Sequence, residues 1–242
     1  MTTKSQTLSY TVGEDELKGY MAYDDKSGSP RPGVIVVHEW WGLDDYIRTR
    51  ADKLAELGYA ALAIDMYGNG ATADSPDEAG AMMNAVLGNM EIGTSRLRTA
   101  HEVLCAQPMV DETRTAAIGY CFGGAMVLHM ARIGMPLKAV VSFHGALGSF
   151  HVPTPGEIKS RILVCHGAKD SLVPENDIES FNAEMASAQA NVKFESYEGA
   201  LHGFTNPDAT ERGQSYGLPL AYDQRADEAS WSEMKALFNE VF

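Results

Sequence analysis

Short apolar runs alternate along this chain with longer segments whose apolar residues recur at helical spacing. The short runs predict strands and the longer segments predict helices. We expect an opening hairpin, joined through residues 13–16, from QTLSYTV and LKGYMAY. Six core strands are then expected from GVIVVHE, YAALAIDM, TAAIGYC, KAVVSFHG, RILVCHG and VKFESYE. Such a succession is typical of a mostly parallel sheet with helices on both faces, so the pattern predicts an α/β fold.

Helices are expected between and after these strands. The segment DDYIRTRADKLAELG ends at Gly58, which predicts a C-terminal cap, and SPDEAGAMMNAVLGNM begins with Ser75 as N-cap and Pro76 at the first helical position. Further helices are expected near residues 91–106, 122–134, 174–189 and 226–241. No linker, composition shift or internal repeat divides the sequence, so residues 1–242 are expected to form one domain.

Composition and charge narrow the range of partners. The formal net charge is −14, whereas a nucleic-acid or anionic-membrane partner requires a dense face of Lys and Arg. The first residues lack the apolar stretch of a secretory signal, and no apolar run approaches the roughly 18 residues of a membrane span. We therefore expect a cytoplasmic protein with neither a nucleic-acid nor a membrane partner.

The three cysteines are thiol candidates. Cys105, Cys121 and Cys165 are widely spaced and form no CxxC pair, which argues against a disulfide framework or a structural zinc site. Cys121 lies in GYCFGG, which has the spacing of a Gly-x-Ser-x-Gly nucleophile elbow with cysteine in place of serine. A rival pattern, GQSYG, carries Ser215 and matches the serine form letter for letter. The sequence thus offers two candidate nucleophiles.

The flanking segments separate the two candidates. An elbow needs a buried strand entering a tight turn and a helix leaving it. Cys121 follows the apolar run TAAIGY and precedes the helical pattern GGAMVLHMARI, and the glycines of its motif relieve crowding between strand and helix. Ser215 follows the polar, Pro-containing TNPDATERGQ, so we expect it in a loop. Cys121 is the predicted nucleophile; its other reading is a small buried apolar residue, as most free cysteines are.

Chain order supplies partners for this thiol. A thiol needs a base, the base needs an orienting group, and elbow enzymes carry them in the order nucleophile, acid, histidine. Asp170 follows the strand RILVCHG, and His202 follows VKFESYE, both at the edge where open α/β sheets assemble their sites. Alone, Asp170 would be read as a cap or turn residue and His202 as a surface histidine. Together with Cys121 they form a predicted triad.

The other histidines are weaker candidates for the base. Those near strand ends are expected in core or supporting roles, and the rest fall in predicted helices or a Pro-rich loop. The first group is His38, His144 and His166, and the second is His101, His129 and His151. The histidines of the second group are not strong candidates for a metal ligand either, and we expect neither a metal site nor a cofactor.

The segment HEWWG ends the third predicted strand, where elbow enzymes supply the second backbone N–H of an oxyanion hole. Phe122 would supply the first N–H, and Trp40 is the predicted second, with Trp41 as the alternative. The two tryptophans also suit an apolar pocket wall, or the core. Glu39 would accept a hydrogen bond from the nucleophile if its side chain turned inward; a solvent-facing carboxylate is the ordinary alternative.

These residues together resemble the dienelactone hydrolase (carboxymethylenebutenolidase) family over nearly the whole chain. The resemblance is carried by HEWWGLDDYIRTRADKLAELGYAALAIDMYG, GYCFGG, HGAKDSLVP and YEGALHGF. It implies a monomeric α/β-hydrolase, a triad of Cys121, Asp170 and His202, and an interaction of Glu39 with the nucleophile.

Two departures from the family concern the substrate. Members carry an arginine four residues after the catalytic histidine to hold a substrate carboxylate, and this chain has Asn206 there. A second such arginine, expected near the middle of residues 72–90, is also missing. Asparagine lacks the charge and the bidentate fork of a guanidinium, so we expect weaker selectivity for anionic lactones. Arg48, Arg50 or Arg212 would compensate if the fold brought one to the pocket.

The predicted reaction is hydrolysis of an activated ester or lactone, a small-molecule substrate, through a thioester acyl-enzyme. One alternative is a promiscuous carboxylesterase or thioesterase for hydrophobic activated esters, which suits the missing arginines and the paired tryptophans. Another, from a different class, is a non-catalytic ligand-binding relative with a vestigial site.

Overall fold

The computed structural model describes residues 3–25 and 28–242, and the chain folds into two compact units, Met1–Ile118 and Gly119–Phe242. The single domain expected from the sequence stays a prediction. The described residues hold eight strands and seven helices, and the apolar pattern predicts the strands and every helix except Ala209–Tyr216.

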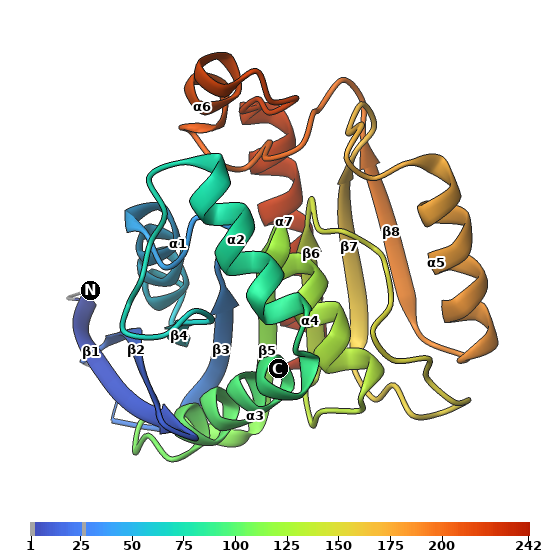
Figure 1. The fold of residues 1–242 in the computed structure, drawn as a ribbon. Helices are drawn as coiled ribbons and strands as arrows, with labels where there is room; N and C mark the ends of the chain where they lie inside the picture. Colours follow the sequence, from blue (N-terminus) through green and yellow to red (C-terminus); the bar gives the residue numbers. More distant parts are fainter. Residues whose placement is uncertain (1–2, 26–27) are drawn as a thin grey trace. The chain divides into compact units, whose positions relative to one another are not determined.

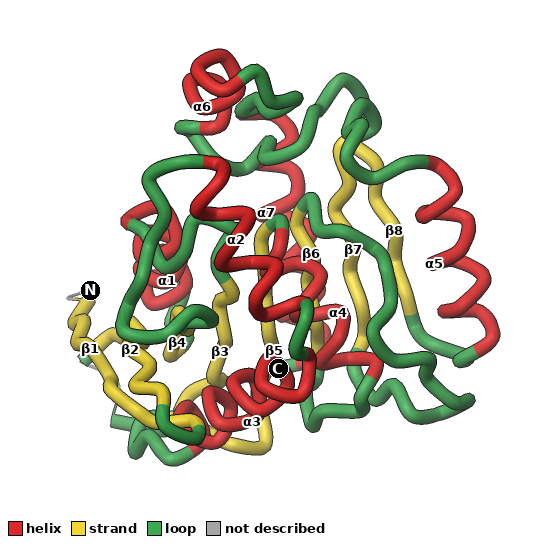
Figure 2. The backbone as a smooth tube through the Cα atoms, viewed as in Figure 1, coloured by secondary structure: helices red, strands yellow, loops and turns green. Residues whose placement is uncertain are grey.

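In the first unit the strands begin with the expected hairpin. Its two strands pair antiparallel, the second pairs antiparallel with β4, and β3 pairs parallel with β4. The order is β1-β2-β4-β3-β5 (Figures 1 and 2). The bounds are β1 (Thr3–Val12), β2 (Asp15–Asp24), β3 (Arg31–Val37), β4 (Ala60–Ile64) and β5 (Val110–Tyr120), the last of which runs across the boundary between the units.

Helices cover this sheet because its central strands are apolar on both faces. Residues 34–37 of β3 are fully buried, so neither face of that strand meets solvent. The helix α1 contacts β2, β3 and β4, and α3 contacts β1 and β3. The Ser75 N-cap is confirmed, since its hydroxyl accepts the Glu78 amide at 3.3 Å, whereas the C-cap of α1 is Leu57, and Gly58, with φ +93°, is the residue after it. The helices of this unit are α1 (Asp45–Glu56), α2 (Pro76–Leu87) and α3 (Met90–Cys105).

In the second unit three parallel strands lie in the order β6-β7-β8. The helix α4 contacts β6, and α7 contacts β6 and β7. The bounds of the strands are β6 (Ala139–Phe143), β7 (Arg161–Gly167) and β8 (Val192–Tyr197). Those of the helices are α4 (Phe122–Arg132), α5 (Glu175–Ser187), α6 (Ala209–Tyr216) and α7 (Gln224–Val241).

Every residue of α4 is buried, including its last residue, Arg132. The Arg132 side chain is 0% exposed, and its Nη2 lies 2.7 Å from a carboxylate oxygen of Glu184 on α5. Its guanidinium also donates to the carbonyls of Leu147 at 2.8 Å and Gly148 at 3.2 Å. This ion pair neutralises a buried charge and ties α4 to α5 and to the segment after β6.

The expectation of a loop around Ser215 is wrong. Ser215 lies exposed in α6, a helix of eight residues that the periodicity did not predict. Only Ala209 and Gly213 of this helix are buried, so its apolar face is too short to produce a visible pattern. Gly217, with φ +66°, closes it in the left-handed conformation that favours glycine. GQSYG is therefore the end of a surface helix and lacks the strand of a nucleophile elbow.

Within the described ranges, no helix has both the length and the apolar character needed to cross a membrane.

Candidate active site

Cys121 occupies a sharp turn between β5 and α4. Its backbone has φ +53° and ψ −114°, a conformation rarely adopted by a residue with a side chain. The Cys121 amide donates to the Phe143 carbonyl at 3.0 Å, and the Cys121 carbonyl accepts the Gly124 amide at 3.0 Å. These bonds hold the strained turn, and the thiol stands at the N-terminus of the helix, where the helix dipole favours negative charge.

The glycines of the motif let strand, helix and neighbouring loop approach one another. A Cβ atom on Gly119 would collide with the Gly123 backbone, and one on Gly124 would lie 2.7 Å from the Gly145 Cα. Any side chain at either position would push the strand or the helix away. The spacing GYCFGG therefore has a steric cause, as the sequence predicts for an elbow.

Asp170 and His202 meet as the chain order predicts. His202 Nδ1 lies 2.8 Å from Asp170 Oδ2, and the Asp170 side chain is 0% exposed. The other carboxylate oxygen accepts the Leu172 amide at 2.9 Å. The carboxylate is thus fixed from two sides, and its hydrogen bond places the proton of His202 on Nδ1. The Leu172 amide was not among the predicted site groups, although an Asp that bonds the amide two residues on is a common turn.

His202 also interacts electrostatically with Cys121. Burial lowers the pKa of His202, but the charge of Cys121 and the hydrogen bond to Asp170 raise it well above its usual value. The Nε2 atom of His202 is buried, and a hydrogen bond with the Cys121 side chain is among the causes that raise the His202 pKa. Because Nδ1 is engaged by Asp170, Nε2 is the nitrogen that can exchange a proton with the thiol. The structure therefore places His202 in interaction with both Asp170 and Cys121, and the catalytic role of the three residues stays a prediction.

Phe122 is the first residue of α4, so its amide is one of those that lack an acceptor within the helix. Glu39, Trp40 and Trp41, which are expected beside the nucleophile, lie in the first unit. Glu39 and Trp41 are buried there, at 5% and 4% exposure. Trp40 packs against Trp41 with ring centroids 5.0 Å apart, and the Trp40 carbonyl accepts the Tyr67 hydroxyl at 2.9 Å. Their roles toward the nucleophile stay predictions.

Asn206 is 1% exposed, and its side-chain oxygen accepts the Asp208 amide at 2.9 Å. It therefore holds the turn that leads into α6, and its contact with substrate stays a prediction. Two of the arginines proposed to compensate lie on α1: Arg48 pairs with Asp45 at 3.0 Å, and Arg50 is 3% exposed with its guanidinium carbon over the Tyr46 ring, 5.2 Å from the centroid. Their role toward a substrate carboxylate stays a prediction, as does that of Arg212.

The other histidines near strand ends are buried and are held by contacts within the fold. His38 accepts the Met66 amide at 3.1 Å, and burial lowers its pKa, so it stays neutral. His166, at the end of β7, likewise has its pKa lowered by burial, although Asp170 acts in the opposite direction. His144 is fully buried, and its ring contacts that of His202. The supporting role expected for these histidines stays a prediction, and the ring of His144 is in contact with the predicted base.

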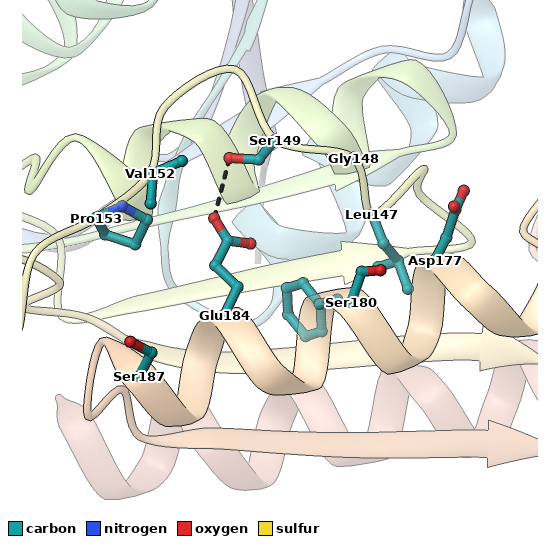
Figure 3. A pocket seen from close by; sticks show the side chains of 10 residues that line it. Leu147, Gly148, Ser149, Val152, Pro153, Asp177, Ser180, Glu184 and Ser187 are labelled. Atoms are coloured by element: carbon teal, nitrogen blue, oxygen red, sulfur yellow. Dashed lines mark hydrogen bonds between the residues drawn. The ribbon is translucent and has the colours of Figure 1, made fainter.

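A separate cavity of about 330 Å³ lies between α5 and the segment after β6 (Figure 3). Glu184 reaches across it and accepts a hydrogen bond from Ser149 at 2.9 Å. None of the triad residues lines this cavity. Its walls are Leu147, Gly148, Ser149, Val152, Pro153, Asp177, Ser180, Phe181, Glu184 and Ser187.

Comparison with known proteins places this site in context. The model of the dienelactone hydrolase family matches residues 17–242. A Synechocystis protein named "Putative carboxymethylenebutenolidase" is 29% identical, over 98% of this chain and 98% of that protein. The solved structure named "m3DLH" is 39% identical and covers 99% of both chains with a TM-score of 0.92. A metagenomic protein, P91, described as a dienelactone hydrolase-like promiscuous phosphotriesterase, is 37% identical over 99% of both chains with a TM-score of 0.90.

Proposed function

The chain belongs to the dienelactone hydrolase family and has the α/β-hydrolase fold, and we propose that it cleaves activated esters and lactones through a thioester on Cys121. Membership of this family makes it a hydrolase of esters or lactones. One observation carries the finer proposal. A histidine fixed by a buried carboxylate at 2.8 Å interacts through its charge with a cysteine held at a strained strand-to-helix turn.

In the first half of the reaction, His202 Nε2 takes the proton of the Cys121 thiol, and the sulfur attacks the substrate carbonyl carbon. The negative charge then develops on the carbonyl oxygen. The Phe122 amide and the positive end of α4 stabilise it, and the Trp40 amide is the proposed second donor. The tetrahedral intermediate collapses when the leaving oxygen receives the proton from His202, which leaves a thioester.

In the second half, His202 removes a proton from water, and the resulting hydroxide attacks the thioester carbonyl. Collapse of this intermediate expels the Cys121 sulfur, which recovers its proton from His202. Asp170 keeps the Nδ1–H tautomer throughout and stabilises the imidazolium in each transition state. The Glu39 carboxylate is the proposed modulator of the thiol.

A thiolate selects its substrates by leaving-group basicity. A thiol of pKa about 8.5 departs from the tetrahedral intermediate more readily than an alkoxide whose parent acid has a pKa near that of water, about 15.7. Alkyl esters and amides therefore return to starting material. Enol lactones, aryl esters and thioesters proceed, so they are the proposed substrate class.

The relative P91 supports a second candidate activity, because its description names a phosphotriesterase and 37% of its aligned residues are identical. A phosphotriester with an aryl leaving group offers the nucleophile an electrophilic phosphorus in place of the carbonyl carbon. A promiscuous esterase or thioesterase for hydrophobic activated esters is the remaining enzymatic alternative. Turnover of a matched set, an aryl acetate, an aryl thioester, a dienelactone and an aryl phosphotriester, distinguishes these activities.

The test of the proposed function is a burst experiment with an aryl ester on the native protein and on Cys121→Ala. We expect a burst of one phenol per active site followed by steady turnover, with both lost in the variant. Stoichiometric binding without release would instead support the non-catalytic, ligand-binding alternative. The monomeric state and the cytoplasmic location stay predictions.

A further inference from the structure

His144 and Thr205 form a buried hydrogen bond beside the triad. His144 Nε2 lies 2.7 Å from Thr205 Oγ1, and both residues are 0% exposed. The bond joins two segments that are 61 residues apart in the sequence, the end of β6 and the loop that carries His202. A buried polar pair of this kind is costly to break, because either partner left alone loses its hydration without compensation.

The end of β6 is a rigid anchor for this bond. His144 has φ +40°, an unusual conformation for a residue with a side chain, and its amide donates to the Cys165 carbonyl at 2.8 Å. The preceding residue, Phe143, accepts the amide of Cys121 at 3.0 Å. Phe143 therefore holds the backbone of the nucleophile, and the next residue, His144, is held against β7.

The His144 ring also contacts the imidazole of His202 directly. The two ring centroids are 5.3 Å apart at an interplanar angle of 65°. Phe204 lies on the same loop as His202, and the centroid of its ring is 5.2 Å from that of the His144 ring. Thr205 follows Phe204, and the Asn206 amide closes the turn onto the Gly203 carbonyl at 2.9 Å. One ring therefore touches the base itself while its nitrogen holds the loop that presents the base.

We propose that His144 and Thr205 act as a positioning pair that sets the plane of the His202 imidazole. The hydrogen bond to Asp170 fixes the Nδ1 atom of His202 but leaves the ring able to tilt about that contact. The His144 ring limits this tilt, and the bond to Thr205 holds the His144 ring in place. Proton transfer depends steeply on such alignment and His202 moves protons in both halves of the reaction, so loss of the pair slows both formation and hydrolysis of the thioester without weakening substrate binding.

This inference rests on the proposed function, and its experiment compares kcat and KM for an aryl ester in full-length variants. Thr205→Val keeps the volume of the side chain and removes the hydroxyl, whereas Thr205→Ser keeps the hydroxyl. We expect kcat of Thr205→Val to fall about tenfold, roughly the value of one hydrogen bond, with KM nearly unchanged. Thr205→Ser should stay within about twofold of the native kcat.

The first unit provides a matched control. His101 Nε2 lies 3.1 Å from Thr115 Oγ1, another buried histidine–threonine hydrogen bond, and neither residue belongs to the proposed machinery. Thr115→Val should lose comparable thermal stability and keep the native kcat. The positioning role is overturned if Thr205→Val keeps the native kcat, if Thr205→Ser is equally slow, or if Thr115→Val loses as much activity.

Two further variants complete the test. If Thr205→Val does not fold, His144→Phe, which keeps a ring and removes the nitrogen, gives the same comparison with the same expected fall in kcat. The double variant His144→Phe/Thr205→Val should be no slower than the slower single variant, since both remove one interaction. If the losses in kcat of the two single variants add up in the double variant, His144 and Thr205 do not act as a pair. Cys121→Ala separates failure of this inference from failure of the proposed function. If the native protein hydrolyses the ester no faster than Cys121→Ala, the proposed function is overturned. If the native protein is active and Thr205→Val is equally active, only the positioning role is overturned.

Discussion

Replacement of Asp170 by asparagine tests the orientation of the base with almost no change of shape. The Leu172 amide, 2.9 Å from one carboxylate oxygen, can bond only to an oxygen, so the new amide oxygen stays on that side. The new NH₂ group then faces His202 Nδ1, where the native oxygen lies at 2.8 Å. Two donors cannot share that distance, so His202 shifts its proton to Nε2. That nitrogen then has no lone pair for the thiol proton.

The size of the effect combines two losses. The wrong tautomer must be reversed before proton transfer, and the imidazolium loses a charge-assisted hydrogen bond worth about 1.5–3 kcal/mol. The same change in a serine triad lowers kcat about 10,000-fold. A thiol is more acidic than a serine hydroxyl and depends less on the base, so we expect a fall between about 100-fold and 10,000-fold, or roughly 3 to 5.5 kcal/mol.

The assay is stopped-flow release of a phenol from an aryl ester, with thermal unfolding of the same samples as the control for folding. Asp177→Asn on α5 makes the same change of charge outside the triad and should keep the native rate. The reasoning is refuted if Asp170→Asn folds normally and retains more than about a tenth of the native kcat. Another carboxylate would then orient His202.

Three further predictions concern the elbow, the core and the pocket. Cys121→Ala should abolish aryl-ester hydrolysis and Ser215→Ala should leave it unchanged, because that serine lies exposed on a surface helix; loss of turnover in the serine variant alone would reverse the assignment. Glu184→Gln leaves the 0%-exposed Arg132 side chain without its counter-charge, so the free energy of unfolding in urea should fall by about 3 kcal/mol; an unchanged midpoint and slope would contradict this. Asn206→Arg should raise kcat/KM for a carboxylate-bearing lactone relative to its methyl ester by about 10- to 100-fold at low salt. A strong, salt-sensitive preference for the anion in the native protein, not increased in the variant, would point to a cationic clamp elsewhere.

Sequence patterns predict those parts of this protein that follow a general structural rule. The strands could be predicted because each is a continuous apolar run, and the triad residues follow strand ends in the order of an elbow enzyme. Asp170 and His202 could be paired only through this order, since 32 positions separate them. The distance of 2.8 Å between them is a property of the folded chain.

Two side-chain contacts and one helix could not be predicted from any sequence pattern. Thr205 is one polar residue in a loop, and nothing adjacent to it indicates a bond to His144. The pairing of Arg132 with Glu184 joins two helices 52 positions apart, and each residue alone reads as an ordinary charge on a helix surface. The helix α6 escaped prediction because only two of its eight residues are buried. Tertiary packing determined all three.

The central claim, a thioester on Cys121, is tested most directly by mass spectrometry of the protein quenched in acid during turnover of an aryl ester. The account predicts that the acyl mass appears on the tryptic peptide 115–132, which contains Cys121, and disappears after neutral hydroxylamine, as a thioester does. In His202→Ala the acylated peptide should accumulate far more slowly than in the native protein. Acyl mass on the peptide 213–225, which carries Ser215, or steady turnover with no acylated cysteine, would contradict the account.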